Sequence, residues 1–220
     1  MQTPTLGLQE DVIEQLAFDP RVDSDDIAVS LKEGIVTLHG RVADLNQKWL
    51  VEDIVKRVKG VHGVVDELVV DLPAAHVRND TDIAISIEHR FRTSSIVPRD
   101  VTFVVRGGNV TLQGEATWHY QAQEAACEAR RVTGVKGVTN LIAIKGVAAP
   151  DAAEIKRKIH GALQRLADVD AKNIYVTVSG GSVKLTGTAR TWAEYDNATQ
   201  AAWSVSGVTH VDNFIGVTPW

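Results

Sequence analysis

Side chains that commonly carry out catalysis or bind metals are scattered in this sequence and form no recognised motif. The seven histidines are His39, His62, His76, His89, His119, His160 and His210. No H-E-x-x-H motif, P-loop, dinucleotide fingerprint or nucleophile elbow occurs among the 220 residues. The single cysteine, Cys127, excludes an internal disulfide and a cysteine-based zinc or iron–sulfur site. The sequence therefore predicts a protein that is not an enzyme and that holds no metal or cofactor.

Regularly spaced glycines are the other candidate for chemistry, because glycine-rich loops can cradle phosphate groups. The motif G-x-V-x-L-x-G occurs three times, and a further glycine follows each copy 20 residues later; these glycines are Gly34, Gly40, Gly60, Gly108, Gly114, Gly134, Gly181, Gly187 and Gly207. Each motif follows one predicted strand and opens another, whereas phosphate-binding loops lead into a helix N-terminus. We therefore interpret these glycines as structural residues of turns and helix ends. Their offsets of 74 and 73 residues identify three repeats of one unit, in which the histidines occupy unrelated positions.

Each repeat predicts a helix, two strands, a second helix and a last strand. Apolar residues four positions apart, such as Ile155, Ile159 and Leu163, predict the first helix, and alternating apolar residues predict the hairpin that follows it. The second helix lies between the last two glycines, and its apolar stripe is rich in alanine in repeats two and three, which indicates close packing on the sheet. Three units are predicted at residues 1–73, 77–146 and 150–220, with linkers at Pro73–Val77 and Gly146–Pro150.

The order of elements, the G-x-V-x-L-x-G strand and a later G-V-x-x-V motif resemble the BON domain, which is named for bacterial osmotically inducible periplasmic proteins and nodulation proteins. The resemblance extends from residue 8 to residue 217, and a polar residue follows the valines in every copy, at Asp66, Asn140 and Asn213. It implies an α+β fold in which each unit is a small three-stranded mixed sheet with two helices packed on one face. It also implies a non-enzymatic, transport-associated module that binds phospholipid membranes or acts in envelope stress and chaperoning. We expect the polar residue to order the last strand by hydrogen bonding to the backbone.

Two tryptophans lie where the other repeats have polar residues. Trp49 and Trp203 lie in the second helices of repeats one and three, at two repeat positions that are seven residues apart and therefore share one helix face. An apolar residue on a polar face indicates a contact. This contact is either packing between neighbouring units or a surface for a protein partner or a membrane. Trp118 and Trp192, near the starts of their second helices, are interpreted as hydrophobic staples.

Charge differs between the three units. Residues 8–72 carry 7 basic and 14 acidic side chains, residues 78–146 carry 9 and 7, and residues 151–220 carry 7 of each. The middle unit is therefore the candidate for contact with anionic phospholipids, through Arg130, Arg131 and Lys136 together with Trp118 and His119. The alternative interpretation is that these arginines stabilise the C-terminal end of the second helix.

Overall composition limits the possible partners. The net charge of −5 argues against general affinity for nucleic acid, and no apolar run is long enough for a transmembrane segment. No signal peptide is visible, so the sequence as it stands predicts a cytoplasmic protein, or a periplasmic one if a signal peptide has been removed. The expected partners are an anionic phospholipid surface or, alternatively, protein clients of a holdase-like interaction scaffold.

Overall fold

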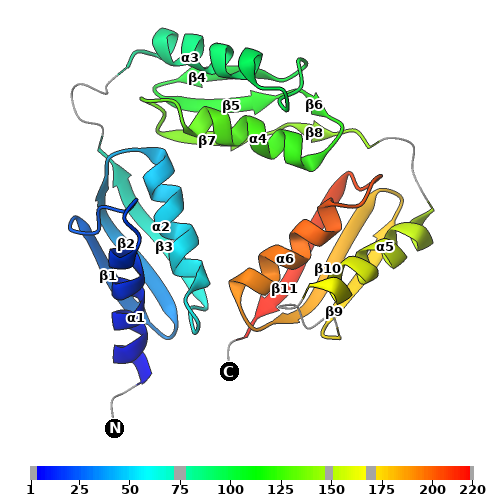
Figure 1. The fold of residues 1–220 in the computed structure, drawn as a ribbon, viewed down its shortest axis with the longest axis horizontal. Coiled ribbons are helices and arrows are strands. Elements are labelled where there is room, and N and C mark those ends of the chain that lie inside the picture. The colour runs from blue at the N-terminus through cyan, green and yellow to red at the C-terminus, as the bar shows by residue number, and fades with distance from the viewer. Residues whose placement is uncertain (1–3, 72–77, 147–150, 167–171, 219–220) are drawn as a thin grey trace.

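Three similar α+β units lie around a common centre in the computed structural model, which describes residues 4–71, 78–146, 151–166 and 172–218 (Figure 1). Unit 1 contains α1 (Pro4–Phe18), β1 (Ile27–Lys32), β2 (Ile35–Val42), α2 (Leu45–Arg57) and β3 (Gly63–Val70). Unit 2 contains α3 (Asp80–Thr93), β4 (Thr102–Arg106), β5 (Asn109–Gln113), β6 (Glu115–Ala116), α4 (His119–Arg130), β7 (Gly137–Asn140) and β8 (Ala143–Ile144). Unit 3 contains α5 (Ala152–Arg165), β9 (Ile174–Ser179), β10 (Ser182–Ala189), α6 (Trp192–Trp203) and β11 (His210–Val217). Apart from Gly146, both predicted linkers lie outside the described residues, as does His76.

Each unit has a mixed sheet whose central strand pairs with one antiparallel and one parallel neighbour. The strand orders are β1-β2-β3, β4-β5-β7 and β9-β10-β11. Two helices cover one face of each sheet (Figure 1). The predicted fold class and order of elements are therefore confirmed. Unit 2 differs in one respect, because its last strand is interrupted at Leu141 and Ile142 and the short pair β6–β8 continues beyond the interruption.

The core of each unit lies between its helices and its sheet. The predicted stripes of the first helices are buried at Val12, Leu16, Ile83, Ile87, Phe91, Ile155, Ile159 and Leu163, and those of the second helices at Val51, Val55, Ala125, Ala129, Val132, Ala198, Ala202 and Val205. Leu8 and Val58 are only partly buried at the margin of the unit 1 core. Alanines bring α4 and α6 close to their sheets because they place little bulk between helix and strand.

The last glycine of each G-x-V-x-L-x-G motif is required by a close backbone approach. Gly40, Gly114 and Gly187 have φ angles of 128°, 119° and 120°, which residues with a Cβ rarely adopt. A Cβ at these positions would overlap the carbonyl oxygen of Asp26, Asp100 or Asn173, respectively. The interpretation of these glycines as structural is consistent with this geometry.

The polar residue of the last strand works as the sequence predicts. A side-chain oxygen of Asp66, Asn140 or Asn213 accepts a hydrogen bond from the backbone N–H two residues further on, at 3.0, 3.2 and 2.9 Å. The second polar atom of each side chain contacts the second helix, through Lys48 Nζ at 3.1 Å, the Ala122 carbonyl at 2.9 Å and Thr199 Oγ1 at 2.6 Å. This residue therefore also fixes the last strand to the helix that precedes it.

Candidate functional site

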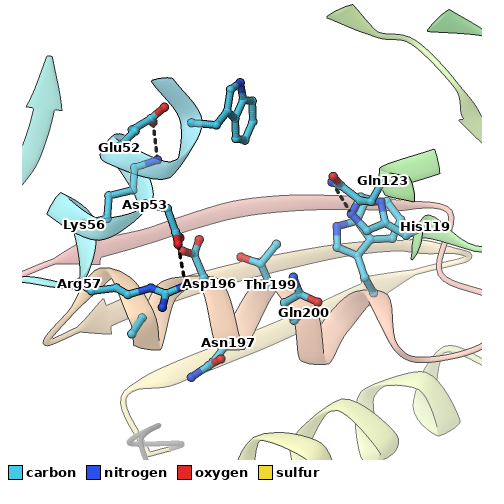
Figure 2. Close-up of a pocket in the computed structure, with 13 residues that line it drawn as sticks. Glu52, Asp53, Lys56, Arg57, His119, Gln123, Asp196, Asn197, Thr199 and Gln200 are labelled. Atoms are coloured by element: carbon cyan, nitrogen blue, oxygen red, sulfur yellow. Dashed lines mark hydrogen bonds and ion pairs between the residues drawn. The ribbon is translucent and has the colours of Figure 1, made fainter. Parts of the chain in front are cut away.

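The second helices of the three units converge on a central cleft with a cavity volume of about 800 Å³ (Figure 2). Its walls come from α2, α4 and α6. Each unit contributes the same helix face, because Trp49, Gln123 and Asp196 occupy equivalent positions in the repeat and all three line the cleft. The face on which the sequence singled out Trp49 and Trp203 is thus the face that meets the neighbouring units.

A tryptophan lies at each of the three junctions between units. At the junction of units 1 and 2, the guanidinium carbon of Arg130 lies 4.2 Å from the ring centroid of Trp49, a cation–π contact. At the junction of units 2 and 3, the rings of His119 and Trp203 stack with 4.0 Å between centroids and 6° between planes. At the junction of units 3 and 1, Trp192 packs against the unit 1 core.

The hydrophobic-staple interpretation of Trp118 and Trp192 is wrong. A staple requires the residue that precedes the N-cap. Trp118 is itself the N-cap of α4, and Trp192 is the first residue of α6. Both side chains face neighbouring units instead. The residue pattern within one repeat carries no information on contacts between units.

Charged groups in the cleft are mostly paired along one helix (Figure 2). In α2, Lys56 Nζ lies 2.6 Å from Glu52 Oε1, and a guanidinium nitrogen of Arg57 lies 2.6 Å from Asp53 Oδ2. Asp196 of α6 faces these residues, and burial raises its pKa, with a further small contribution from Asp53 that Lys56 opposes. Burial lowers the pKa of His119, so the stacked imidazole favours its neutral form.

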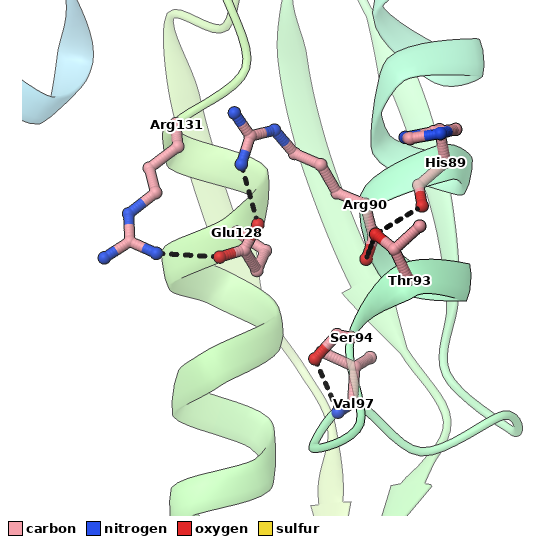
Figure 3. A network of polar contacts seen from close by, with 7 residues as sticks. All are labelled: His89, Arg90, Thr93, Ser94, Val97, Glu128 and Arg131. Carbon is pink, nitrogen blue, oxygen red and sulfur yellow. Dashed lines mark hydrogen bonds and ion pairs between the residues drawn. The ribbon is translucent and has the colours of Figure 1, made fainter.

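Of the five residues predicted as an anionic-lipid surface, Trp118, His119 and Arg130 line one groove, whereas Arg131 and Lys136 do not. His119 and Arg130 take part in junctions between units. Arg131 donates to Glu128 Oε1 at 2.7 Å, and Glu128 also accepts from Arg90 of α3 at 2.8 Å (Figure 3). Lys136 lies apart from them, beside the β4–β5 turn.

Trp118 faces a second groove that the sequence analysis missed. This groove, of about 840 Å³, lies between unit 2 and helix α5 of unit 3, which contributes Arg157, Lys158, His160 and Arg165. Lys158 Nζ pairs with Glu154 at 2.8 Å, whereas Arg157 and Arg165 form no ion pair with any residue in the described part of the chain. The run Lys156-Arg157-Lys158 was a visible signal in the sequence, but equal numbers of acidic and basic residues in unit 3 hid it from a count per unit.

The described residues contain no metal-binding cluster, and the glycine turn of unit 2 is no open phosphate cradle. Within the described residues, no three His, Cys, Asp or Glu side chains are arranged to hold a metal ion. In unit 2, the backbone N–H groups of Gly107 and Gly108 donate to the carboxylate of Asp80 at 2.8 and 2.9 Å. An internal carboxylate therefore occupies the place that a phosphate would take in this turn.

The family model of the BON domain matches residues 6–71, 79–146 and 151–219. This chain belongs to the BON-domain family. Among BON-domain relatives, Osmotically-inducible protein Y of Escherichia coli (strain K12) is 34% identical over 124 residues, which are 54% of this chain and 62% of that protein. The match thus covers less than two thirds of the relative's length.

Similarity to solved structures is weak over the whole BON-domain chain. CdsD, a structural protein of the Type III secretion system of Chlamydia trachomatis, gives a TM-score of 0.28 at 15% identity, over 97% of this chain and 93% of that one. The PrgH periplasmic domain gives 0.24 at 7% identity, over 89% and 96%. Both scores are too low to indicate a shared arrangement of units. No helix among the described residues is long and apolar enough to cross a bilayer.

Proposed function

We propose that this BON-domain protein is a non-enzymatic module that binds weakly to anionic phospholipid surfaces in the bacterial envelope. The family and the name of the Escherichia coli relative support a setting in osmotic stress. The observation that carries the proposal is the groove between Trp118 and the basic side chains of α5.

The basic side chains of this groove form one stripe along α5. Arg157, Gly161 and Arg165 are four residues apart, a spacing that aligns side chains on one helix face. The opposite face carries Ile155 and Ile159, which are fully buried in the unit 3 core. The cations therefore point away from their own unit, and a half-buried indole lies on the other side of the groove.

Electrostatics alone makes this contact weak. A basic residue near an anionic membrane contributes about 1 kcal/mol, and salt screens that contribution within a Debye length of about 8 Å at physiological ionic strength. Arg157, Arg165 and the partly compensated Lys158 would together give reversible binding. Insertion of Trp118 between headgroups adds apolar contact, since indole favours the membrane interface.

Vesicle co-sedimentation at low salt tests the proposal. The full chain is expected to bind vesicles that contain phosphatidylglycerol and to leave neutral phosphatidylcholine vesicles unbound. Arg157→Glu with Arg165→Glu should abolish sedimentation with the anionic vesicles. A control with the same change of charge, Lys32→Glu with Arg106→Glu, alters exposed strand residues of units 1 and 2 and should bind as the parent does.

The pair Arg130→Glu and Arg131→Glu completes the experiment. If only this double variant loses binding to anionic vesicles, the phospholipid contact is made by the unit 2 surface that the sequence predicts. Absence of binding to both kinds of vesicle would contradict the phospholipid function.

A protein-interaction or holdase-like scaffold is the second candidate function. It is supported by the central cleft, in which Trp49 and Trp203 could contact apolar side chains of a client. Suppression of aggregation of an unfolded protein, without sedimentation with vesicles, would select this function.

A further inference from the structure

Two large aromatic side chains are exposed on the helix-free face of the unit 3 sheet. Tyr175 on β9 and Phe214 on β11 have exposed fractions of 65% and 63%. Both pair in register with Thr186 of the central strand β10, so the three residues form one row across the sheet. Their neighbours Ile174 and Ile215 point to the other face and are buried beneath the helices.

The equivalent rows of the other units show that the fold does not require these aromatics. In unit 1 the row is Ala28, His39 and Glu67, and in unit 2 the corresponding residues are Thr102, Gln113 and Leu141. Exposed aromatic rings add nothing to the core of unit 3, and contiguous exposed apolar surface usually marks a contact with something else.

The surroundings of the row are hydroxylated and electrically balanced. Thr177 of β9 and Thr186 and Thr188 of β10 lie on the same face of the sheet as the two aromatic residues. Lys184 Nζ lies 4.9 Å from the ring centroid of Phe214, and Asp212 lies 3.0 Å from His210. The charges of Lys184 and Asp212 offset each other.

The small area and the balanced charge of this sheet face argue against a protein or a nucleic acid as its ligand. The face measures about 26 Å along eight residues of β10 and about 14 Å across three strands, or about 370 Å². A stable protein interface covers about 800 Å² on each partner, and nucleic acid requires a surplus of cations. A membrane held by α5 meets the opposite side of unit 3, because α5 packs on the other face of this sheet.

We propose that this face binds a neutral glycan chain of β-linked pyranoses. The negative face of an aromatic ring attracts the C–H groups of a sugar ring, and the apolar ring face removes them from water. Tyr175 and Phe214 are separated by two strand spacings, about 9.6 Å, which is close to the length of a disaccharide. Two sugar rings of one chain can therefore stack on the two aromatics while its hydroxyl groups hydrogen-bond to the threonines.

Calorimetric titration of the full chain with cellohexaose and with hexa-N-acetylchitohexaose tests the site. At least one of these glycans should bind, and Tyr175→Ala and Phe214→Ala should each weaken binding at least tenfold. Tyr175→Phe should retain it, because the ring face is kept. Phe18→Ala is the matched control, since this phenylalanine is 82% exposed on α1 of unit 1. All four variants should unfold at the parent temperature, because the altered side chains are exposed.

Three results would overturn the proposal. The first is absence of binding to both glycans. The second is binding of a thymidine oligonucleotide that is lost in the same variants, which would assign the row to single-stranded nucleic acid. The third is a dimer of the parent chain that dissociates in Phe214→Ala, which would assign it to a second copy. None of these results depends on vesicle binding, which uses a different face.

Discussion

Two basic segments of the chain differ in whether their charges are available. At the end of α4, Arg131 is paired with Glu128, and Arg130 lies over Trp49 of unit 1. On α5, Arg157 and Arg165 line a groove and have no ion pair within the described residues. The sequence favours the first segment because unit 2 has the positive net charge. A binding surface therefore depends on which cations lack an internal partner.

Position in the ring of units explains this difference. The inner helices α2, α4 and α6 face the cleft, so charges on them meet neighbouring units (Figure 1). Helix α5 packs on the sheet beside α6 and presents its basic stripe away from the unit 3 core. Charges on an inner helix therefore stabilise the assembly, whereas charges on α5 face solvent.

The largest expected effect comes from removal of Glu128. Its side chain is 14% exposed and holds both Arg90 and Arg131. Glu128→Ala should lower the free energy of unfolding by about 1.5 kcal/mol, because hydrogen bonds to charged groups are lost. The same change frees two arginines and should raise affinity for anionic vesicles several-fold. Urea unfolding and vesicle co-sedimentation measure the two effects.

The pH dependence sharpens this prediction. Burial alone would raise the pKa of Glu128, but hydrogen bonds from Arg90 and Arg131 outweigh it and lower the pKa below its ordinary value of 4.5. A lowered folded-state pKa means that this stabilisation is present above pH 4.5 and is lost as the pH falls through the folded-state pKa. Glu124→Ala, one turn earlier on α4, is the control and should leave both readouts unchanged. If Glu128→Ala behaves like this control, the charges of α4 are as available as those of α5.

The repeated parts of the structure could be predicted from the sequence, and the junctions could not. Three copies provide an internal alignment, so the core stripes and the polar residue at Asn213 follow from the pattern. The sequence also predicts that the helix face with Trp49 makes a contact, because the other two copies have polar residues at the equivalent position. Its partner Arg130 lies in another unit, and repeat periodicity carries no information on how units dock. The basic stripe of α5 could not be recognised from the charge count, because that count covers the whole of unit 3 and the acidic residues of the unit cancel the local positive charge.

A smaller effect is expected at the stack of His119 and Trp203. Burial lowers the pKa of His119 from its ordinary value of 6.5, so docking of units 2 and 3 is fully stabilised above pH 6.5 and weakens as the pH falls through the folded-state pKa. Trp203→Ala should remove about 1 kcal/mol of docking energy and return the pKa of His119 towards 6.5. Titration of the His119 ring by NMR measures the shift. Trp49→Ala should leave that pKa unchanged, and an unshifted pKa in Trp203→Ala would mean that the stack does not form in solution.

The smallest effect is expected at the contact of Arg130 with Trp49. A partly exposed cation–π pair is worth about 0.5 kcal/mol, so a double-mutant cycle of Arg130→Gln and Trp49→Leu should give a coupling of that size in urea unfolding. Arg130→Lys should keep part of the coupling, because an ammonium group also interacts with an indole face. Affinity for anionic vesicles should stay the same in all of these variants, since this guanidinium already has an internal partner. Zero coupling together with weaker vesicle binding would show that Arg130 is free to meet an anionic surface, and the distinction between α4 and α5 would then fail.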